Sequence, residues 1–204
     1  MEIRERILNK TFELMSRLGV SSVTMDTIAQ QCGISKRTLY EQFTDKRTLL
    51  QTVLHRLYVQ RSLSFSRAIH SAPNKLEAML SMYFITKEYV ATVSEVFIND
   101  IERLYPEIQL ECREREKLYL HELTRLIEEG QQEGVFRRGF KAAIAATSFT
   151  QQMRTVKPSI GQYPEGTTVI EVLDTQFINF MRGIASDKGI KIIDKVLNDH
   201  GIKP

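Results

Sequence analysis

Apolar residues recur every three or four positions along most of the chain, a spacing that places them on one face of an α-helix. The first such stretch runs from Ile3 to Leu18 and stops at Gly19, a residue type that favours helix ends. The spacing predicts an all-α fold of about nine or ten helices, without repeats or low-complexity segments. Helices are expected over residues 3–18, 24–32, 36–43, 46–70, 75–91, 93–104, 106–133, 141–156, 167–186 and 190–199.

The stretch TMDTIAQQCGISKRTLYEQFTDKRTLL, which begins at Thr24, carries the most specific pattern in the chain. Thr24 is a good helix N-cap, Gly33 suits a tight turn, and Ser35 caps a second short helix. Leu39 and Phe43 fall on one side of that helix, so its polar residues face outward. Two short helices joined in this way form a helix-turn-helix, whose second helix offers its N-terminal residues to base edges in the DNA major groove.

The run IAQQCGISKRTLYEQFTDKRTLL resembles the N-terminal domain of the TetR/AcrR family of bacterial transcriptional regulators. The family's features occur in register at Thr24, Ile28, Ala29, Gly33, Ile34, Ser35, Leu39, Tyr40, Phe43, Lys46 and Leu49. The resemblance is strong over about the first fifty residues and weak beyond them. One departure is that Arg47 and Thr48 follow Lys46, where the family often has a carboxylate.

The outward surface of the second short helix has two possible roles, contact with DNA or an ordinary solvated helix face. Lys36, Arg37 and Thr38 stand at its N-terminus, where base edges would be reached. The resemblance implies phosphate contacts for Thr24, Tyr40 and Lys46, and a lysine at a helix start can share one phosphate with the free backbone N–H groups. The expected DNA-binding residues are therefore Thr24, Ser35, Lys36, Arg37, Thr38, Tyr40 and Lys46.

The distribution of charge adds modest support for DNA contact. Residues 1–60 hold nine Lys or Arg against six acids, so this part carries the whole net charge of +3. A basic bias confined to one region suits a local phosphate-binding footprint. The alternative is a chance excess, because three charges is a small number.

The helix expected over residues 46–70 is long enough to belong to two domains, since about 1.5 Å per residue gives a length of roughly 35 Å. We therefore expect a helix-turn-helix DNA-binding domain over residues 1–46 and an effector-binding and dimerisation domain over residues 47–204. Tilting this helix would move the DNA-reading part, which makes it the natural mechanical link. The role of residues 157–166 and of the last helix is not indicated by the sequence.

Methionine and aromatic side chains are frequent between about residues 75 and 156, and such side chains can line a small-molecule pocket. At helical spacing they are more often plain core, and this alternative stays open. The family resemblance implies a ligand cavity inside this bundle. The candidate pocket residues are Met79, Tyr83, Phe97, Tyr119 and Phe149.

Two helices near the C-terminus are candidates for a dimer interface. The helix expected over 167–186 is apolar on more than one face, and the one over 141–156 begins with small residues that permit close packing. A two-fold dimer would let two helix-turn-helix units read a palindrome. The alternative is burial under the last helix of the same chain. The candidate interface residues are Phe149, Met153, Val172, Phe177 and Phe180.

Other classes of function lack candidate residues. The sequence has no Walker loop, no GxGxxG and no serine elbow, so we expect no catalytic residues, no cofactor and no enzyme activity. Its four histidines are scattered, so no metal site is expected. The charged N-terminus does not resemble a signal peptide, and no run is long enough to span a bilayer, which predicts a cytoplasmic protein without a membrane partner.

Together with the resemblance, these observations predict a ligand-responsive transcriptional regulator, most simply a repressor. It would bind a palindromic double-stranded DNA operator as a homodimer and be released by a small-molecule effector of unknown identity. Two alternatives from other classes remain. One is a ligand-binding or protein-interaction module in which the helix-turn-helix is only a scaffold, and the other is a small helical enzyme.

Overall fold

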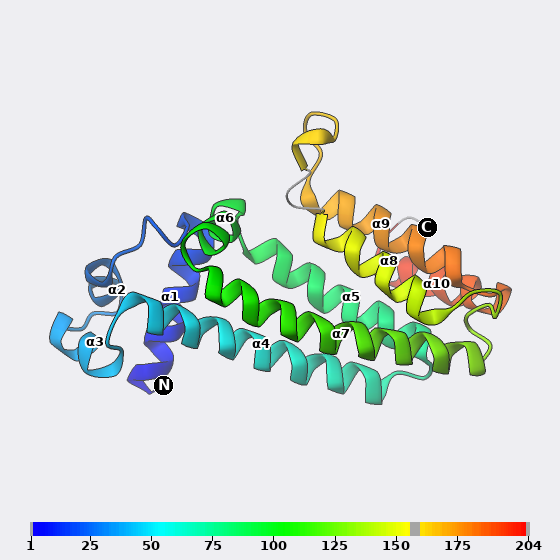
Figure 1. The fold of residues 1–204 in the computed structure, drawn as a ribbon, viewed down its shortest axis with the longest axis horizontal. Helices are drawn as coiled ribbons and strands as arrows, with labels where there is room; N and C mark the ends of the chain where they lie inside the picture. The colour runs from blue at the N-terminus through cyan, green and yellow to red at the C-terminus, as the bar shows by residue number, and fades with distance from the viewer. Residues whose placement is uncertain (1, 156–159, 203–204) are drawn as a thin grey trace. The chain divides into compact units, whose positions relative to one another are not determined.

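The computed structural model describes residues 2–155 and 160–202, and the expected all-α fold is confirmed over them (Figure 1). The helices of these residues are α1 (Ile3–Leu18), α2 (Met25–Gln31), α3 (Lys36–Gln42), α4 (Lys46–Ser71), α5 (Lys75–Thr92), α6 (Glu95–Leu104), α7 (Pro106–Gln132), α8 (Ala142–Thr155), α9 (Val169–Ile184) and α10 (Asp187–Asp199), with a short 3-10 helix at Ile160–Gln162.

Apart from the C-terminal end of α8, the sequence placed the ends of α1 to α9 within two residues, because capping residues mark most of them. Thr24 accepts a hydrogen bond from the backbone N–H of Thr27 at 3.1 Å and starts α2. Thr168 starts α9 with a full capping box: its hydroxyl accepts from the backbone N–H of Glu171, and the Glu171 carboxylate accepts from the backbone N–H of Thr168. The expected end of the eighth helix at Val156 lies outside the described residues.

The predicted start of the last helix was wrong by three residues. We expected Gly189 to precede it, but the helix begins at Asp187 and Ser186 is its N-cap, accepting from Gly189 N–H at 3.1 Å. Gly189 is buried in the first turn, where a Cβ would lie 2.2 Å from the carbonyl oxygen of Val135. The glycine therefore allows close packing of backbones and does not mark a helix end.

The chain folds into two compact units. The first unit consists of residues 1–63 and 89–113, and the second of residues 64–88 and 114–204. Helices α4, α5 and α7 each contribute residues to both units. The expected boundary between a DNA-binding domain and an effector-binding domain, after residue 46, concerns function and stays a prediction. Neither compact unit corresponds to one of these domains, because neither is one continuous segment.

The core of the first unit joins the N-terminal helices to α6. The side chains of Ile7, Met15 and Leu39 are fully buried, and so is Phe97 of α6. The ring of Phe97 meets that of Phe12 edge to face, with 6.4 Å between centroids. Residues far along the chain therefore complete the core that supports the short helices α2 and α3.

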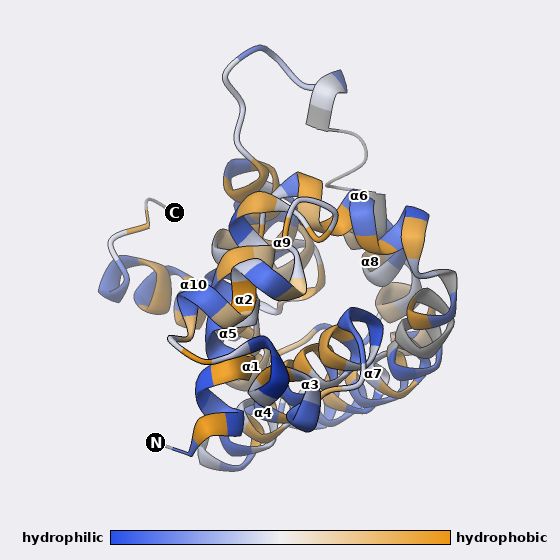
Figure 2. Ribbon diagram, turned by 90° about the vertical axis from the view of Figure 1, so that its left-hand side faces the viewer, coloured by the Kyte–Doolittle hydropathy of each residue, from blue (hydrophilic) through white to orange (hydrophobic). Residues whose placement is uncertain are grey.

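The core of the second unit is built from apolar stripes of the later helices. Figure 1 shows α8 and α9 running side by side, and Figure 2 shows orange apolar and blue polar residues interleaved along α9 and α10, as in amphipathic helices. Met181 and Ile193 are fully buried between them. Amphipathic packing thus accounts for this bundle.

Candidate functional site

The second short helix, α3, is held by a tight turn and two apolar anchors. Gly33 has a φ of +60°, a conformation that glycine adopts at little cost, and the next residue, Ile34, donates its N–H to the Ala29 carbonyl at 3.0 Å. Leu39 and Phe43 are buried beneath the helix, at 0% and 2% exposure. The turn and the anchors fix which face of α3 points outward.

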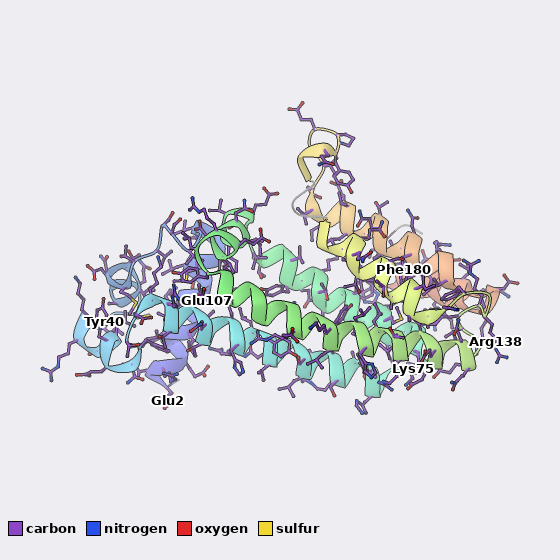
Figure 3. All side chains as sticks on the ribbon, viewed as in Figure 1. Glu2, Tyr40, Lys75, Glu107, Arg138 and Phe180 are labelled. Carbon is purple, nitrogen blue, oxygen red and sulfur yellow. The ribbon has the colours of Figure 1, made fainter. Side chains whose placement is uncertain are left out.

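The outward face of α3 presents the expected DNA-reading residues. Lys36, Arg37 and Tyr40 are exposed, and Figure 3 shows Tyr40 among side chains that extend from this part of the molecule. A helix face with these side chains can offer donors to base edges and phosphates.

Both cations at the start of α3 already have carboxylate partners. Lys36 Nζ lies 2.5 Å from Asp26 Oδ2, and Arg37 Nε lies 3.0 Å from Glu41 Oε1. The first pair joins α3 to α2, and the second lies within α3. The sequence placed the cations correctly on the surface but did not indicate these partners.

The hydroxyls proposed for DNA contact also act as helix caps. Ser35 accepts from the backbone N–H of Thr38 at 3.0 Å, and the two hydroxyl oxygens are 2.9 Å apart. Thr24 has the same arrangement with Thr27, whose hydroxyl oxygen is 2.9 Å away. Ser35 and Thr24 are exposed, and Thr38 is half-buried. A local structural role therefore accompanies any role in binding.

Lys46 is half-buried at the start of α4. Burial lowers the pKa of its ammonium group, and the nearby carboxylate of Asp100 partly opposes this effect. Asp45 caps the helix by accepting from Thr48 N–H at 2.7 Å, a bond that lowers the pKa of the Asp45 carboxyl. The start of α4 is thus a capped helix N-terminus with one lysine, a suitable phosphate site.

Asp100 is a buried carboxylate of α6 that the sequence did not single out. It is 4% exposed and accepts from both the backbone N–H and the hydroxyl of Ser21, each at 2.7 Å. Burial alone would raise its pKa, but the hydrogen bonds from Ser21, together with Arg103, hold the pKa below its usual value. The bond ties α6 to the loop before α2, and a separation of 79 residues leaves no local pattern to reveal it.

Arg4 of α1 is a second contact that local patterns did not reveal. Its guanidinium donates to the Gln42 carbonyl at 3.2 Å and lies 4.4 Å from the centroid of the Phe43 ring. A cation beside the last carbonyls of α3 also favours that end of the helix dipole. Arg4 therefore holds the C-terminal end of α3.

A polar cluster joins α5 and α9 inside the second unit. The Tyr83 hydroxyl donates to Asp174, and Lys87 Nζ lies 2.8 Å from the other oxygen of that carboxylate. The Tyr83 ring stacks on Phe177 with 3.9 Å between centroids. Burial, followed by the contact with Asp174, raises the pKa of the Tyr83 hydroxyl, which therefore stays protonated at neutral pH.

The structure brings together four of the five candidate pocket residues. Met79, Tyr83 and Phe149 are buried in the core of the second unit, and Tyr119 is half-buried against it. Phe97 belongs to the core of the first unit instead. Sequence spacing alone could not assign Phe97 to one core or the other, because either core accepts an aromatic residue at helical spacing.

Three of the five candidate dimer residues are buried within their own chain. Phe149, Val172 and Phe177 are 5%, 4% and 3% exposed, whereas Met153 and Phe180 are half-buried. Phe180, labelled in Figure 3, stacks on Phe149 with 4.4 Å between centroids. The exposed residues of these helices are Ala143, Ile144, Ser148, Gln151 and Gln152 of α8 and Glu171, Thr175, Asn179 and Gly183 of α9.

The described residues contain neither a candidate metal site nor a membrane-spanning helix. Across residues 2–155 and 160–202, no group of three His, Cys, Asp or Glu side chains is placed to hold a metal ion. Over the same part of the chain, no helix has the length and apolar character needed to cross a membrane.

Two protein-family models match this chain, one in its N-terminal part and one in its C-terminal part. The family model of bacterial regulatory proteins of the tetR family matches residues 7–53, and that of the tetracyclin repressor-like C-terminal domain matches residues 70–157. The HTH-type transcriptional regulator UidR of Escherichia coli K12 is 41% identical over 51 residues, which are 25% of this chain and 26% of UidR. The chain thus matches about a quarter of the length of this curated relative.

Two solved structures share the fold over nearly the whole chain. A transcriptional regulator from Saccharomonospora viridis in complex with choline aligns with a TM-score of 0.71 and 20% identity, covering 90% of this chain and 97% of that one. The SmeT–triclosan complex aligns with a TM-score of 0.67 and 16% identity, covering 91% and 92%. At these identities the likeness concerns the fold.

Proposed function

Since the chain belongs to the TetR family of bacterial regulatory proteins, we propose that it is a DNA-binding transcriptional regulator controlled by a small-molecule effector. The observation that carries this proposal is the exposed face of α3, with Lys36, Arg37 and Tyr40 outward on a helix anchored by Leu39 and Phe43. Regulation of transcription requires no catalytic group, and we propose none.

Residues 1–46 are the DNA-binding part in this proposal, and residues 47–204 bind the effector and form the dimer. Lys36, Arg37 and Thr38 read base edges, whereas Thr24, Tyr40 and Lys46 contact phosphates, and Ser35 fixes the start of the reading helix. The chromosomal target makes the cytoplasm the place of action.

The regulator acts as a homodimer on a palindromic operator, because one helix-turn-helix contacts too little DNA for useful specificity. The exposed faces of α8 and α9 form the interface, centred on Ile144 and on the row Thr175, Asn179 and Gly183. Small residues in such a row allow two helices to approach closely. The buried residues Phe149, Val172 and Phe177 support this face from within.

The effector binds in the second unit, next to Tyr83 and Phe149. Similar folds have been solved with choline and with triclosan, which supports a small-molecule site in this bundle. Helix α4 is one uninterrupted helix of 26 residues with residues in both units, so it is the element suited to transmit the effect of binding. Effector and DNA then bind with negative coupling, and the regulator is a repressor.

The test is selection of bound duplexes from a random-sequence DNA pool by the purified full-length protein. We expect the selected sequence to be palindromic. Its affinity for the dimer should fall steeply with salt concentration, because each neutralised phosphate releases counterions. A folded, effector-free protein that enriches no sequence, and whose weak DNA binding does not depend on salt, would contradict the proposal. It would favour a helical module in which the helix-turn-helix is only a scaffold.

A further inference from the structure

On the surface of the helix-turn-helix that would read DNA bases, the two cations at the start of α3 are matched by two acidic side chains. Lys36 and Arg37 occupy the first two positions of α3, and Asp26 of α2 and Glu41 of α3 are their partners at 2.5 Å and 3.0 Å. The four charges cancel. A surface whose partner is a polyanion is therefore locally neutral where base contacts are made, although the chain as a whole carries a net charge of +3.

These ion pairs are too exposed to contribute much to the stability of the fold. The side chains of Lys36 and Asp26 are 63% and 58% exposed, and those of Arg37 and Glu41 are 89% and 56% exposed. Pairs with this exposure stabilise a protein by about 0–1 kcal/mol, so a better partner can replace either carboxylate.

DNA offers two kinds of replacement partner, which differ in quality. A phosphate offers charge and is present at every position of any sequence. A matching base edge offers directed acceptors, such as the O6 and N7 of guanine for an arginine or lysine. A carboxylate held beside the cation competes with the phosphate and is itself repelled by the DNA backbone, so it penalises contacts that lack a matching base.

We propose that Asp26 and Glu41 are specificity-determining residues of the regulator. They weaken binding to non-cognate DNA by neutralising Lys36 and Arg37, and they release these cations to base edges of the operator. The inference rests on the proposed DNA-binding function and deepens it. It assigns the discrimination between operator and bulk DNA to the two carboxylates as well as to the Lys36 and Arg37 side chains that they accompany.

A purely structural role for the two acids predicts a different result. Asp26 lies in the first turn of α2, where an acid stabilises the helix dipole, and Glu41 supports α3 through an i, i+4 pair. If only these effects mattered, removing the charge would weaken binding to every DNA sequence. The proposal predicts the opposite sign for non-cognate DNA.

The experiment uses the full-length variants Asp26→Asn and Glu41→Gln. Affinity is measured for the duplex selected from the random pool and for a scrambled duplex of the same composition, between 50 and 300 mM salt. We expect each variant to bind the scrambled duplex about two- to fivefold more tightly at low salt, with a salt slope steeper by up to about one unit. The ratio of operator to scrambled affinity should fall.

Glu114→Gln is the matched control, because it removes the same charge from an exposed pair outside the helix-turn-helix. Glu114 Oε1 lies 2.7 Å from Lys117 Nζ, and its side chain is 64% exposed. The variants Asp26→Glu and Glu41→Asp keep the charge and should restore the original ratio. Thermal unfolding of each variant identifies any loss of fold.

Unchanged or weaker binding of the scrambled duplex by both folded variants would overturn the inference, as would an equal gain in Glu114→Gln. Any duplex of arbitrary sequence can replace the scrambled duplex, so the gain in non-cognate binding can be tested without an operator. Failure of the unmodified protein to select any sequence counts instead against the proposed function.

Discussion

Gly19 shows how a single residue sets the close approach of α1 and α6. Its φ is +85°, and a Cβ at this position would lie 2.5 Å from Cγ1 of Val96 and 3.0 Å from Oδ2 of Asp100. With a ψ of 157°, the backbone lies in a region that is almost exclusive to glycine. Both the conformation and the space therefore require glycine.

Replacing Gly19 with Ala should destabilise the protein by about 2–4 kcal/mol, since backbone strain and overpacking add. Gly33→Ala is the control, because Gly33 has a φ of +60° but open space around its Cβ position, and it should cost only about 1–2 kcal/mol. Urea unfolding measures both. Adding Val96→Ala to Gly19→Ala should recover part of the loss, and no recovery would exclude the contact with Val96 as a cause.

At the scale of residues, the sequence predicted features that depend on local spacing. Exposure of Lys36, Arg37 and Tyr40 followed from the positions of the apolar anchors of α3. The contact between Ser21 and Asp100 could not be predicted, because it joins residues that are 79 positions apart. Carboxylate partners of surface cations also depend on how helices are placed and not on spacing alone.

Helix α3 is only seven residues long, so its ends determine whether it forms. Ser35 caps the start, where backbone N–H groups lack partners within the helix, and Arg4 donates to the carbonyl of Gln42, the last residue of α3. A helix this short has little stability alone and depends on such contacts and on packing. The stability of the surface proposed to read DNA therefore depends on the contacts at the two ends of α3.

Substitutions of Ser35 can separate capping from direct DNA contact. Ser35→Ala should lower the free energy of unfolding by about 1 kcal/mol, whereas Ser35→Asn should retain it, because asparagine is an equally good cap. If the role in binding is to fix α3, operator affinity will fall in the alanine variant and be kept in the asparagine variant. Equal loss of affinity in both variants would indicate that the serine hydroxyl itself contacts DNA.

At the scale of elements, capping residues and apolar periodicity were sufficient for most helix ends. The start of α10 was missed because Gly189 was interpreted as a break, whereas its small size serves the approach to Val135. The sequence also could not assign each buried aromatic residue to one of the two cores. Phe97, for example, was expected in the ligand pocket of the C-terminal bundle but belongs to the core of the first unit. Periodicity identifies a buried face but not its partner.

At the scale of the whole molecule, the outward residues of α8 and α9 would form the interface of the proposed dimer. Ile144 is 63% exposed, and in the proposed dimer a second copy would cover it. An interface on this face would contain few charges.

Ile144→Glu should convert the dimer to a monomer at micromolar concentration and lower operator affinity on the order of 100-fold, because binding of two linked units is lost. Light scattering during size-exclusion chromatography measures the mass. Leu118→Glu places the same charge at an apolar residue of α7 that is 66% exposed and should leave the dimer intact. A dimeric Ile144→Glu variant would place the interface elsewhere.

The discontinuity of the first unit limits how parts of this protein can be exchanged with those of related proteins. Residues 89–113 return to that unit and supply Phe97 to its core and Asp100 to the loop at Ser21. A chimeric protein that contains only residues 1–46 of this chain would lack the ring of Phe97 and the carboxylate of Asp100, which these residues contact in the native fold. A working graft would have to carry α6 with the reading helices, or choose a host whose own α6 offers an aromatic residue and an acid at the same places.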